Sequence, residues 1–178
     1  MNTDKWTSQI DRTTEVFKRE FGALTPEELN RKPNPTTWSI AQNIDHLIVT
    51  NGTYYPIIKS VREGSYKTPF TGKIGFMVNM FGKLVLNAVQ PGTRKKIKTF
   101  PIWEPSTSNI PADILARFEK SQAEMKQMIT GCADLLDKRT VISSPANRNI
   151  VYKLEDAFNI IVTHQLRHFE QAKEVISR

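Results

Sequence analysis

Cysteine and histidine are scarce in this chain of 178 residues, which has one cysteine, Cys132, and three histidines. A single thiol cannot form an internal disulfide, so we expect the reducing environment of the cytoplasm. No histidine lies near Cys132 in the sequence, which argues against a thiol nucleophile at this position. The hydrophobic fraction of 39% and the charged fraction of 24% are typical of a soluble globular protein. A chain of this length can bury a core without crosslinks, and we expect one domain over residues 1–178.

Long apolar runs are also missing. The most apolar stretch, residues 74–89, is shorter than the roughly 20 apolar residues that cross a bilayer. Lys73 and Lys83 flank and interrupt it. The N-terminal residues MNTDKW lack the basic stretch and apolar run of a signal peptide. We therefore expect a cytoplasmic protein with no membrane span.

Several catalytic and binding motifs are absent. The sequence has no Gly-x-Ser-x-Gly elbow, no phosphate-binding glycine loop and no dinucleotide fingerprint. The net charge of +7 raises the question of nucleic-acid binding, and one dense basic cluster lies at residues 94–98. No zinc-finger, KH or RRM signature accompanies it. We expect no specific nucleic-acid binding, and interpret the cluster as a solvated loop that attracts anionic small molecules.

Helical periodicity dominates what is present. Apolar residues recur at three- and four-residue steps in five segments. These are residues 4–21, a segment that starts at residue 39, and residues 73–89, 111–131 and 153–177. Alternating apolar runs of strand type are short and rare, with one extended piece expected near Val141. The pattern predicts an all-α fold, a four-helix bundle with short accessory helices.

Local signals place some helix boundaries. Thr25 with Glu28, and Ser39 with Gln42, have the spacing of capping boxes and predict helix starts. Pro56 should kink or interrupt the helix that begins after Ser39. Residues 90–110 form an expected connector whose Phe100 and Trp103 cover the bundle, and residues 137–153 form another.

The three histidines are His46, His164 and His168, and the last two are four residues apart. On a helix His168 falls about 40° from His164, on the face that should pack against the bundle. Two buried imidazoles without partners would cost about 1–3 kcal/mol each, and a divalent metal would satisfy both. His46 lies in another predicted helix, about 120° from the centre of its apolar arc, and could complete a facial triad.

Simpler interpretations remain open at this point. A histidine pair at this spacing also occurs on surfaces by chance, and His46 alone could be a hydrogen-bonded core residue. Zincin proteases have the motif His-Glu-x-x-His, in which the glutamate acts as the general base. The second position here is Gln165, which cannot take a proton. Zincin-type peptidase chemistry is therefore disfavoured. Gln171, on the face of the pair, is a candidate amide for orienting a ligand or cofactor, or for core hydrogen bonding.

Two segments resemble the signatures of the DinB/YfiT-like superfamily. The front segment is TPEELNRKP at residues 25–33, followed by TWSIAQNIDHL at residues 37–47. It has the family's tryptophan-serine pair, Trp38 and Ser39, and the histidine seven residues after that serine, His46. The back segment has the form His-x-x-Arg-His followed by glutamine, matched by His164, Arg167, His168 and Gln171.

The resemblance implies an up-down-down-up four-helix bundle. It also implies a divalent metal, usually zinc or nickel, held by His46, His164 and His168 with open positions for water or a thiol. Homodimers are common in such a family, and its members include thiol-dependent transferases that use low-molecular-weight thiols. We expect a metal-dependent S-transferase or hydrolase acting on a small electrophilic substrate. A non-catalytic bundle that binds a metal or small ligand is the alternative, since one fold hosts many functions.

Overall fold

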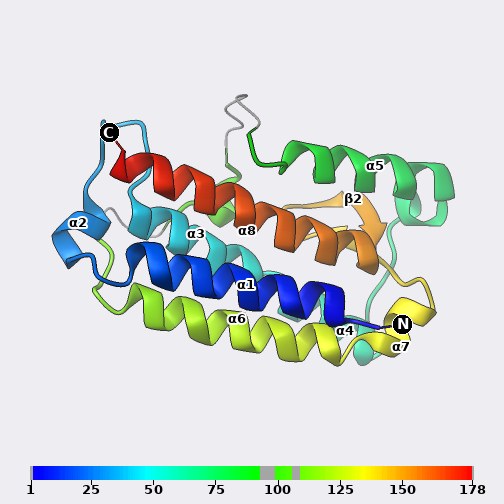
Figure 1. The fold of residues 1–178 in the computed structure, drawn as a ribbon. Helices are drawn as coiled ribbons and strands as arrows, with labels where there is room; N and C mark the ends of the chain where they lie inside the picture. Colours follow the sequence, from blue (N-terminus) through cyan, green and yellow to red (C-terminus); the bar gives the residue numbers. More distant parts are fainter. Residues whose placement is uncertain (1, 93–98, 106–108, 178) are drawn as a thin grey trace.

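The computed structural model describes residues 2–92, 99–105 and 109–177, and it is dominated by helices (Figure 1). Four of them form a bundle: α1 Asp4–Phe21, α3 Ile40–Gly52, α6 Ile114–Thr130 and α8 Leu154–Ile176. The accessory elements are α2 Pro26–Asn30, α4 Tyr55–Arg62, η1 Phe70–Lys73, α5 Gly75–Ala88, η2 Pro101–Trp103 and α7 Ala133–Asp137. The predicted all-α class is confirmed.

Each helix of the bundle lies beside two others. Helix α1 contacts α6 and α8, and α3 also contacts α6 and α8. In Figure 1, α1 and α8 run in one direction while α3 and α6 run in the other. In chain order the helices therefore run up, down, down and up, which is the topology that the resemblance implied.

The local signals read from the sequence account for several helix boundaries. Thr25 and Ser39 each accept a hydrogen bond from the backbone three residues later, and Glu28 and Gln42 complete two capping boxes. Pro56 lies in the first turn of α4, after α3 has ended at Gly52. The proline thus interrupts the predicted helix, because its ring and missing N–H oppose continued helical bonding.

The core consists of two apolar clusters with a polar layer between them. One cluster includes Ile10, Met125 and Ile161, and the other includes Phe17, Phe118 and Phe169, each taken from α1, α6 and α8. The buried polar residues Thr13, Asn51, Gln122 and Gln165 lie between these positions on the four helices of the bundle. Asn51 donates to Gln122 at 3.2 Å, and Gln122 and Gln165 exchange two hydrogen bonds of 2.9 Å. The amides of Asn51, Gln122 and Gln165 are therefore hydrogen-bonded to one another, as burial requires.

A β-hairpin and α5 lie beside the bundle. Strands β1 Val141–Ser144 and β2 Asn147–Lys153 pair antiparallel, so the strand structure extends well beyond the short piece expected near Val141. Helix α5 packs against β2 and α8 (Figure 1). In the part of the chain that the structure describes, no helix combines the length and apolar character needed to cross a bilayer. The basic cluster at residues 94–98 lies outside the described residues.

Candidate metal centre

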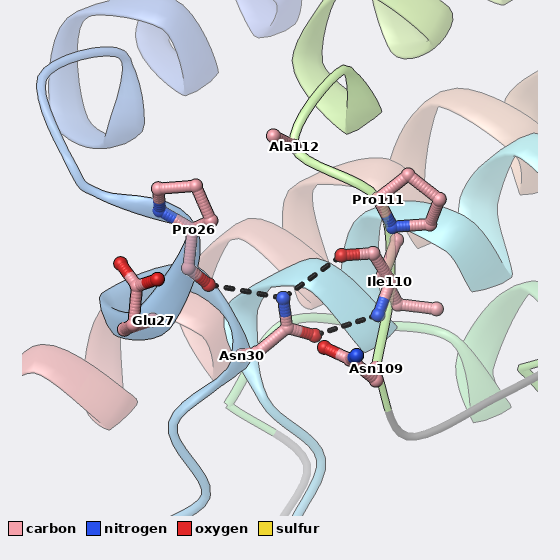
Figure 2. Close-up of a pocket in the computed structure, with 7 residues that line it drawn as sticks. All are labelled: Pro26, Glu27, Asn30, Asn109, Ile110, Pro111 and Ala112. Atoms are coloured by element: carbon pink, nitrogen blue, oxygen red, sulfur yellow. Dashed lines mark hydrogen bonds between the residues drawn. The ribbon is translucent and has the colours of Figure 1, made fainter.

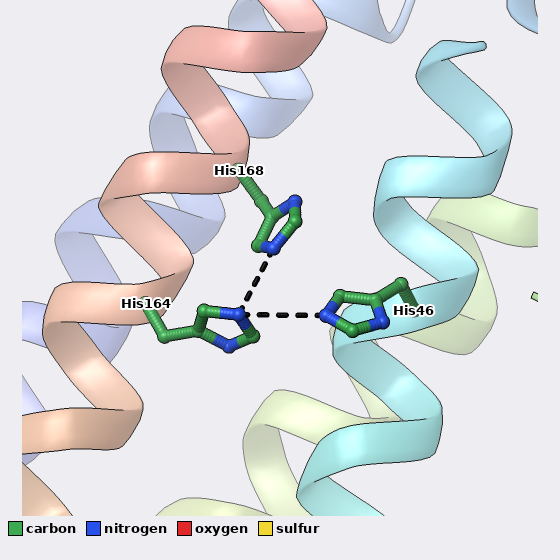
Figure 3. Close-up of side chains that lie close together, drawn as sticks. All are labelled: His46, His164 and His168. Atoms are coloured by element: carbon green, nitrogen blue, oxygen red, sulfur yellow. Dashed lines mark hydrogen bonds between the residues drawn. The ribbon is translucent and has the colours of Figure 1, made fainter. Parts of the chain in front are cut away.

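The three histidines converge from two neighbouring helices. His164 and His168 lie one turn apart on α8, and His46 lies on α3, which packs against α8. The His164 Nε2 atom is 2.9 Å from His168 Nε2 and 3.4 Å from His46 Nε2 (Figure 3). One ligand nitrogen from each histidine lies within 4.8 Å of the other two. The convergence predicted from the sequence is therefore observed.

Two hydrogen bonds determine which nitrogens face the centre of this group. His46 Nδ1 donates to the backbone carbonyl of Trp103 at 2.6 Å. His168 Nδ1 donates to Asn43 Oδ1 at 2.8 Å, while Asn43 Nδ2 donates to the Ser39 carbonyl at 2.9 Å. A carbonyl oxygen can only accept, so both Nδ1 atoms carry the proton. The Nε2 atoms of neutral His46 and His168 then present lone pairs to the centre, the arrangement found in metal-binding histidines.

The spacing of the nitrogens fits one divalent cation. Nitrogen ligands about 2.1 Å from one ion lie about 3.0 Å apart at octahedral angles and about 3.4 Å apart at tetrahedral angles. The two Nε2 separations at His164, 2.9 and 3.4 Å, fall in this range. Among the described residues these three form the one group of His, Cys, Asp or Glu that meets in this way. Three imidazoles without a carboxylate suit zinc or nickel better than magnesium or calcium.

Burial keeps the histidines neutral. It lowers the pKa of His46, although the bond to Trp103 and the charge of Asp45 partly oppose this. Burial, with His46 and Arg167 adding repulsion, lowers the pKa of His164 to about 3. The pKa of His168 is also well below its usual value, because burial and the neighbouring histidines disfavour the cation. Neutral imidazole is the form that binds a metal, so the site is available to a cation at neutral pH.

Two tryptophans contact the histidines, Trp38 through its ring and Trp103 through its backbone carbonyl. The Trp38 ring lies nearly parallel to His168, with centroids 5.9 Å apart, and its centroid is 4.9 Å from that of His46. Trp103 lies in η2, where its indole donates to Thr53 Oγ1 at 3.2 Å while its carbonyl holds His46. Because Thr53 follows His46 by two helical turns, Trp103 is attached to α3 at two points. His46 and His168 are buried, and His164 keeps partial exposure.

The other polar residues close to the histidines in the sequence have different surroundings. Gln165 is fully buried and bonds to Gln122 in the core. Asp45 is buried on α3 and accepts from Arg117 of α6, while Glu170 is exposed. Gln171 is partly exposed three residues after His168, and in the described part of the chain it makes no hydrogen bond to the histidines. Its role as a ligand-orienting amide stays a prediction.

Arg167, the arginine of the back segment, connects α8 to α5. Its guanidinium donates to the Ala88 carbonyl at 2.9 Å and to the Gln90 carbonyl at 3.4 Å. These carbonyls lie at the C-terminus of α5, where the last turn lacks intrahelical partners and a cation is favourable. Arg167 therefore stabilises the position of α5 next to the histidine-bearing helix.

Two surface pockets are lined by residues other than the three histidines. One of about 340 Å³ is lined by residues of α2 and of the chain entering α6 (Figure 2). There Asn30 bonds to both backbone groups of Ile110 and to the Pro26 carbonyl, so its amide serves to join two segments. The other, of about 420 Å³, lies between α4 and the hairpin. Neither pocket is lined by a residue of the three-histidine group.

The hydrogen-bond partners Asn43 and Trp103 are not predicted from the sequence. Trp103 is expected only as a cover for the bundle, and its carbonyl carries no sequence signal at all. Asn43 precedes His46 by three residues, so both lie on one side of α3. That spacing is a signal that could have identified Asn43 as a partner for a histidine on the facing helix.

The family model of the DinB superfamily matches residues 9–172, nearly the whole chain. The chain belongs to the DinB superfamily. No curated protein and no solved structure matches it significantly. The family assignment therefore agrees with the fold and with the three-histidine group, and leaves the reaction to be inferred from the site.

Proposed function

We propose that this member of the DinB superfamily is a metal-dependent enzyme, a thiol-dependent S-transferase or a hydrolase of small electrophilic substrates. The observation that carries the proposal is the meeting of three imidazoles, two of which, His46 and His168, are oriented by hydrogen bonds at Nδ1. His46, His164 and His168 would hold one divalent cation, zinc or nickel. A cation held there would lower the pKa of a water molecule or thiol beside it, and so supply a nucleophile at neutral pH.

The chain's own residues support this chemistry by orientation and exclusion. Asn43 and the Trp103 carbonyl hold the Nδ1 protons of His168 and His46, which keeps both rings turned with Nε2 toward the centre. Trp38 covers the His46 and His168 rings and keeps water from that side. The partial exposure of His164 leaves one side for a substrate to approach. We propose that Gln171 orients a bound thiol or substrate.

The three-histidine group offers no carboxylate to serve as the general base of a zincin-type mechanism. Gln165, at the position of the zincin glutamate, is paired with Gln122. The side-chain amide of Gln165 cannot accept a proton. This supports transfer or hydrolysis that depends on the cation over peptidase chemistry of the zincin type.

Metal content tests the site. Protein purified without a histidine tag is analysed for bound metals as wild type, as His164→Ala and as Lys173→Ala, an exposed control on the same helix. We expect about one zinc or nickel per chain in the wild type and in the control, and a loss of most metal in His164→Ala. Equal metal in all three proteins would remove the proposed site.

Turnover is tested on the metal-loaded protein. It is incubated with a chromogenic electrophile, with and without low-molecular-weight thiols such as glutathione or bacillithiol. Thiol conjugation that His164→Ala abolishes identifies a transferase, and product without thiol identifies a hydrolase. Metal without turnover under either condition would favour the non-catalytic binding protein. The family resemblance also leads us to propose a homodimer, which sedimentation equilibrium would detect.

A further inference from the structure

Helix α5 presents an apolar stripe to solvent. Its inner side packs on β2 and α8, with Val78 and Gly82 buried. On its outer side Phe76, Met80 and Leu84 recur every four residues and are 75%, 38% and 57% exposed. We call these three residues the α5 stripe. Side chains spaced in this way lie on one face of a helix, so the stripe is a continuous apolar surface.

Phe70 extends this apolar character toward the element that precedes the helix. It lies in η1, which packs against α5, and it is 77% exposed. Large exposed apolar side chains on consecutive elements are unusual on a protein surface without a partner.

The positive charge of the protein is concentrated on the same part of the chain. Residues 64–103 contain seven Lys and Arg residues and no Asp or Glu, whereas the other 138 residues contain 18 basic and 18 acidic residues. This segment therefore accounts for the entire net charge of +7. Lys73 and Lys83, both exposed, lie just before and within α5. A partner that matches both the stripe and these two lysines is apolar and negatively charged.

Among macromolecular partners, an anionic bilayer surface combines both properties. A second copy joined face to face through the stripe would bring Lys73 and Lys83 of both copies together, and their like charges would repel. Nucleic acid would satisfy the lysines and leave Phe76 and Leu84 without an apolar environment. A helix with Phe and Leu on one face and Lys beside them can lie in the headgroup region, with the apolar face in the acyl boundary.

We propose that the α5 stripe, flanked by Lys73 and Lys83, docks the protein on membranes that contain anionic lipids. The stripe enters the interface while the lysines contact the headgroups. The docking does not depend on the metal centre, because no residue of the stripe belongs to the three-histidine group.

Cosedimentation with vesicles tests the proposal. The full-length protein is mixed with vesicles of phosphatidylcholine alone or of phosphatidylcholine with phosphatidylglycerol. We expect binding to the anionic vesicles only, and binding that weakens as salt is raised. The variants are Phe76→Ser with Leu84→Ser, and Lys73→Gln with Lys83→Gln. Each pair should reduce the partition coefficient at least about tenfold.

Matched controls replace exposed side chains of the same types elsewhere. Ile176→Ser removes an exposed apolar side chain from α8, and Lys120→Gln an exposed lysine from α6. Both should bind anionic vesicles as the wild type does. Circular dichroism checks the fold of every variant, and Phe76→Ser alone replaces the double variant if that one does not fold.

Results of three kinds, from the vesicles, from self-association and from DNA binding, would overturn the proposal. The first is no binding to anionic vesicles at low salt, or equal losses in the control variants. The second is self-association that Phe76→Ser abolishes, which would assign the stripe to a second copy. The third is binding to duplex DNA that the stripe variants weaken as much as vesicle binding, which would assign it to nucleic acid.

Discussion

The Asn43 side chain on α3 accepts a hydrogen bond from His168 on α8, with 2.8 Å between Asn43 Oδ1 and His168 Nδ1. The same amide donates to the Ser39 carbonyl, so its orientation is set from the other side. One asparagine thereby connects the capped start of α3 to a proposed metal ligand on the facing helix. This bond orients the His168 ring and keeps its Nε2 atom free of a proton.

Replacing Asn43 should weaken metal binding without removing a ligand. Asn43→Leu leaves His168 Nδ1 without its acceptor, and loss of such a partner typically lowers metal affinity about 10- to 100-fold. Asn43→Asp keeps an acceptor oxygen for His168, while it loses the donor to Ser39 and adds a negative charge that favours a bound cation, so its affinity should be no weaker than about that of the wild type. Competition with a chromophoric chelator measures the metal affinity of the wild type and of the two variants. Equal weakening in Asn43→Leu and Asn43→Asp would contradict an orienting role.

The stability of the metal-free protein should fall as the solution is acidified below about pH 6.5. His46, His164 and His168 have lowered pKa values in the fold, with that of His164 at about 3. Between the folded and the unfolded pKa the unfolded chain binds more protons, so the free energy of unfolding decreases with falling pH. The slope reaches about 1.4 kcal/mol per pH unit for each histidine that stays neutral.

Urea unfolding between pH 8 and pH 5, with a chelator present, measures this slope. The variant His164→Gln lacks one titrating group, so its slope should be shallower by about one proton than that of the wild type. Above about pH 7 the two slopes should agree, because the unfolded histidines are neutral there as well. Parallel curves over the whole range would mean that His164 is not held neutral by the fold.

The glutamine pair in the polar layer should be costly to break. Gln165→Leu leaves the buried Nε2 group of Gln122 without an acceptor, while Asn51 still donates to Gln122 Oε1, and the unpaired donor costs about 1–3 kcal/mol. Gln122→Leu removes the partner of both Gln165 and Asn51 and should cost more. Gln127→Leu changes an exposed glutamine on the same helix and should lie within about 0.5 kcal/mol of the wild type. Chemical unfolding measures the free energy of unfolding of each variant. A larger loss in Gln165→Leu than in Gln122→Leu would refute this hydrogen-bond network.

Cys132 should be unreactive in the native protein. It is buried at the start of α7, and burial raises the pKa of its thiol to about 11. Since the thiolate is the reactive form, Ellman's reagent should label the native protein slowly and the urea-unfolded protein at once. Rapid labelling of the native protein would show that the thiol is accessible, against the described burial.

Gln171 should affect ligand binding and leave the metal in place. Replacing it with Ala removes an amide from the partly exposed position three residues after His168. We expect a KM for thiol or substrate raised about tenfold, as for the loss of one hydrogen bond, with unchanged metal content. Lys173→Ala serves as the exposed control on α8. Metal loss in Gln171→Ala would instead assign it to support of the histidines.

Much of the fold follows from short-range signals. The spacing of Ser39 and Gln42 predicts the start of α3, and Pro56 predicts its interruption, because capping and proline effects act within a few residues. The hairpin is underestimated, because β1 has only four residues and β2 begins with the polar residues Asn147, Arg148 and Asn149. Strand pairing depends on a partner segment, which local periodicity does not reveal.

In the proposed site, too, some features follow from the sequence and others depend on the tertiary structure. By itself the sequence determined that His164 and His168 share one helix face, since four residues make about one turn. Only the tertiary structure decided that His46 meets them, because this needs α3 to lie against α8. It alone also decided that Asn43 and the Trp103 carbonyl hold the two Nδ1 atoms. Spacing along a helix is set by backbone geometry, whereas contacts between helices depend on how the whole core packs.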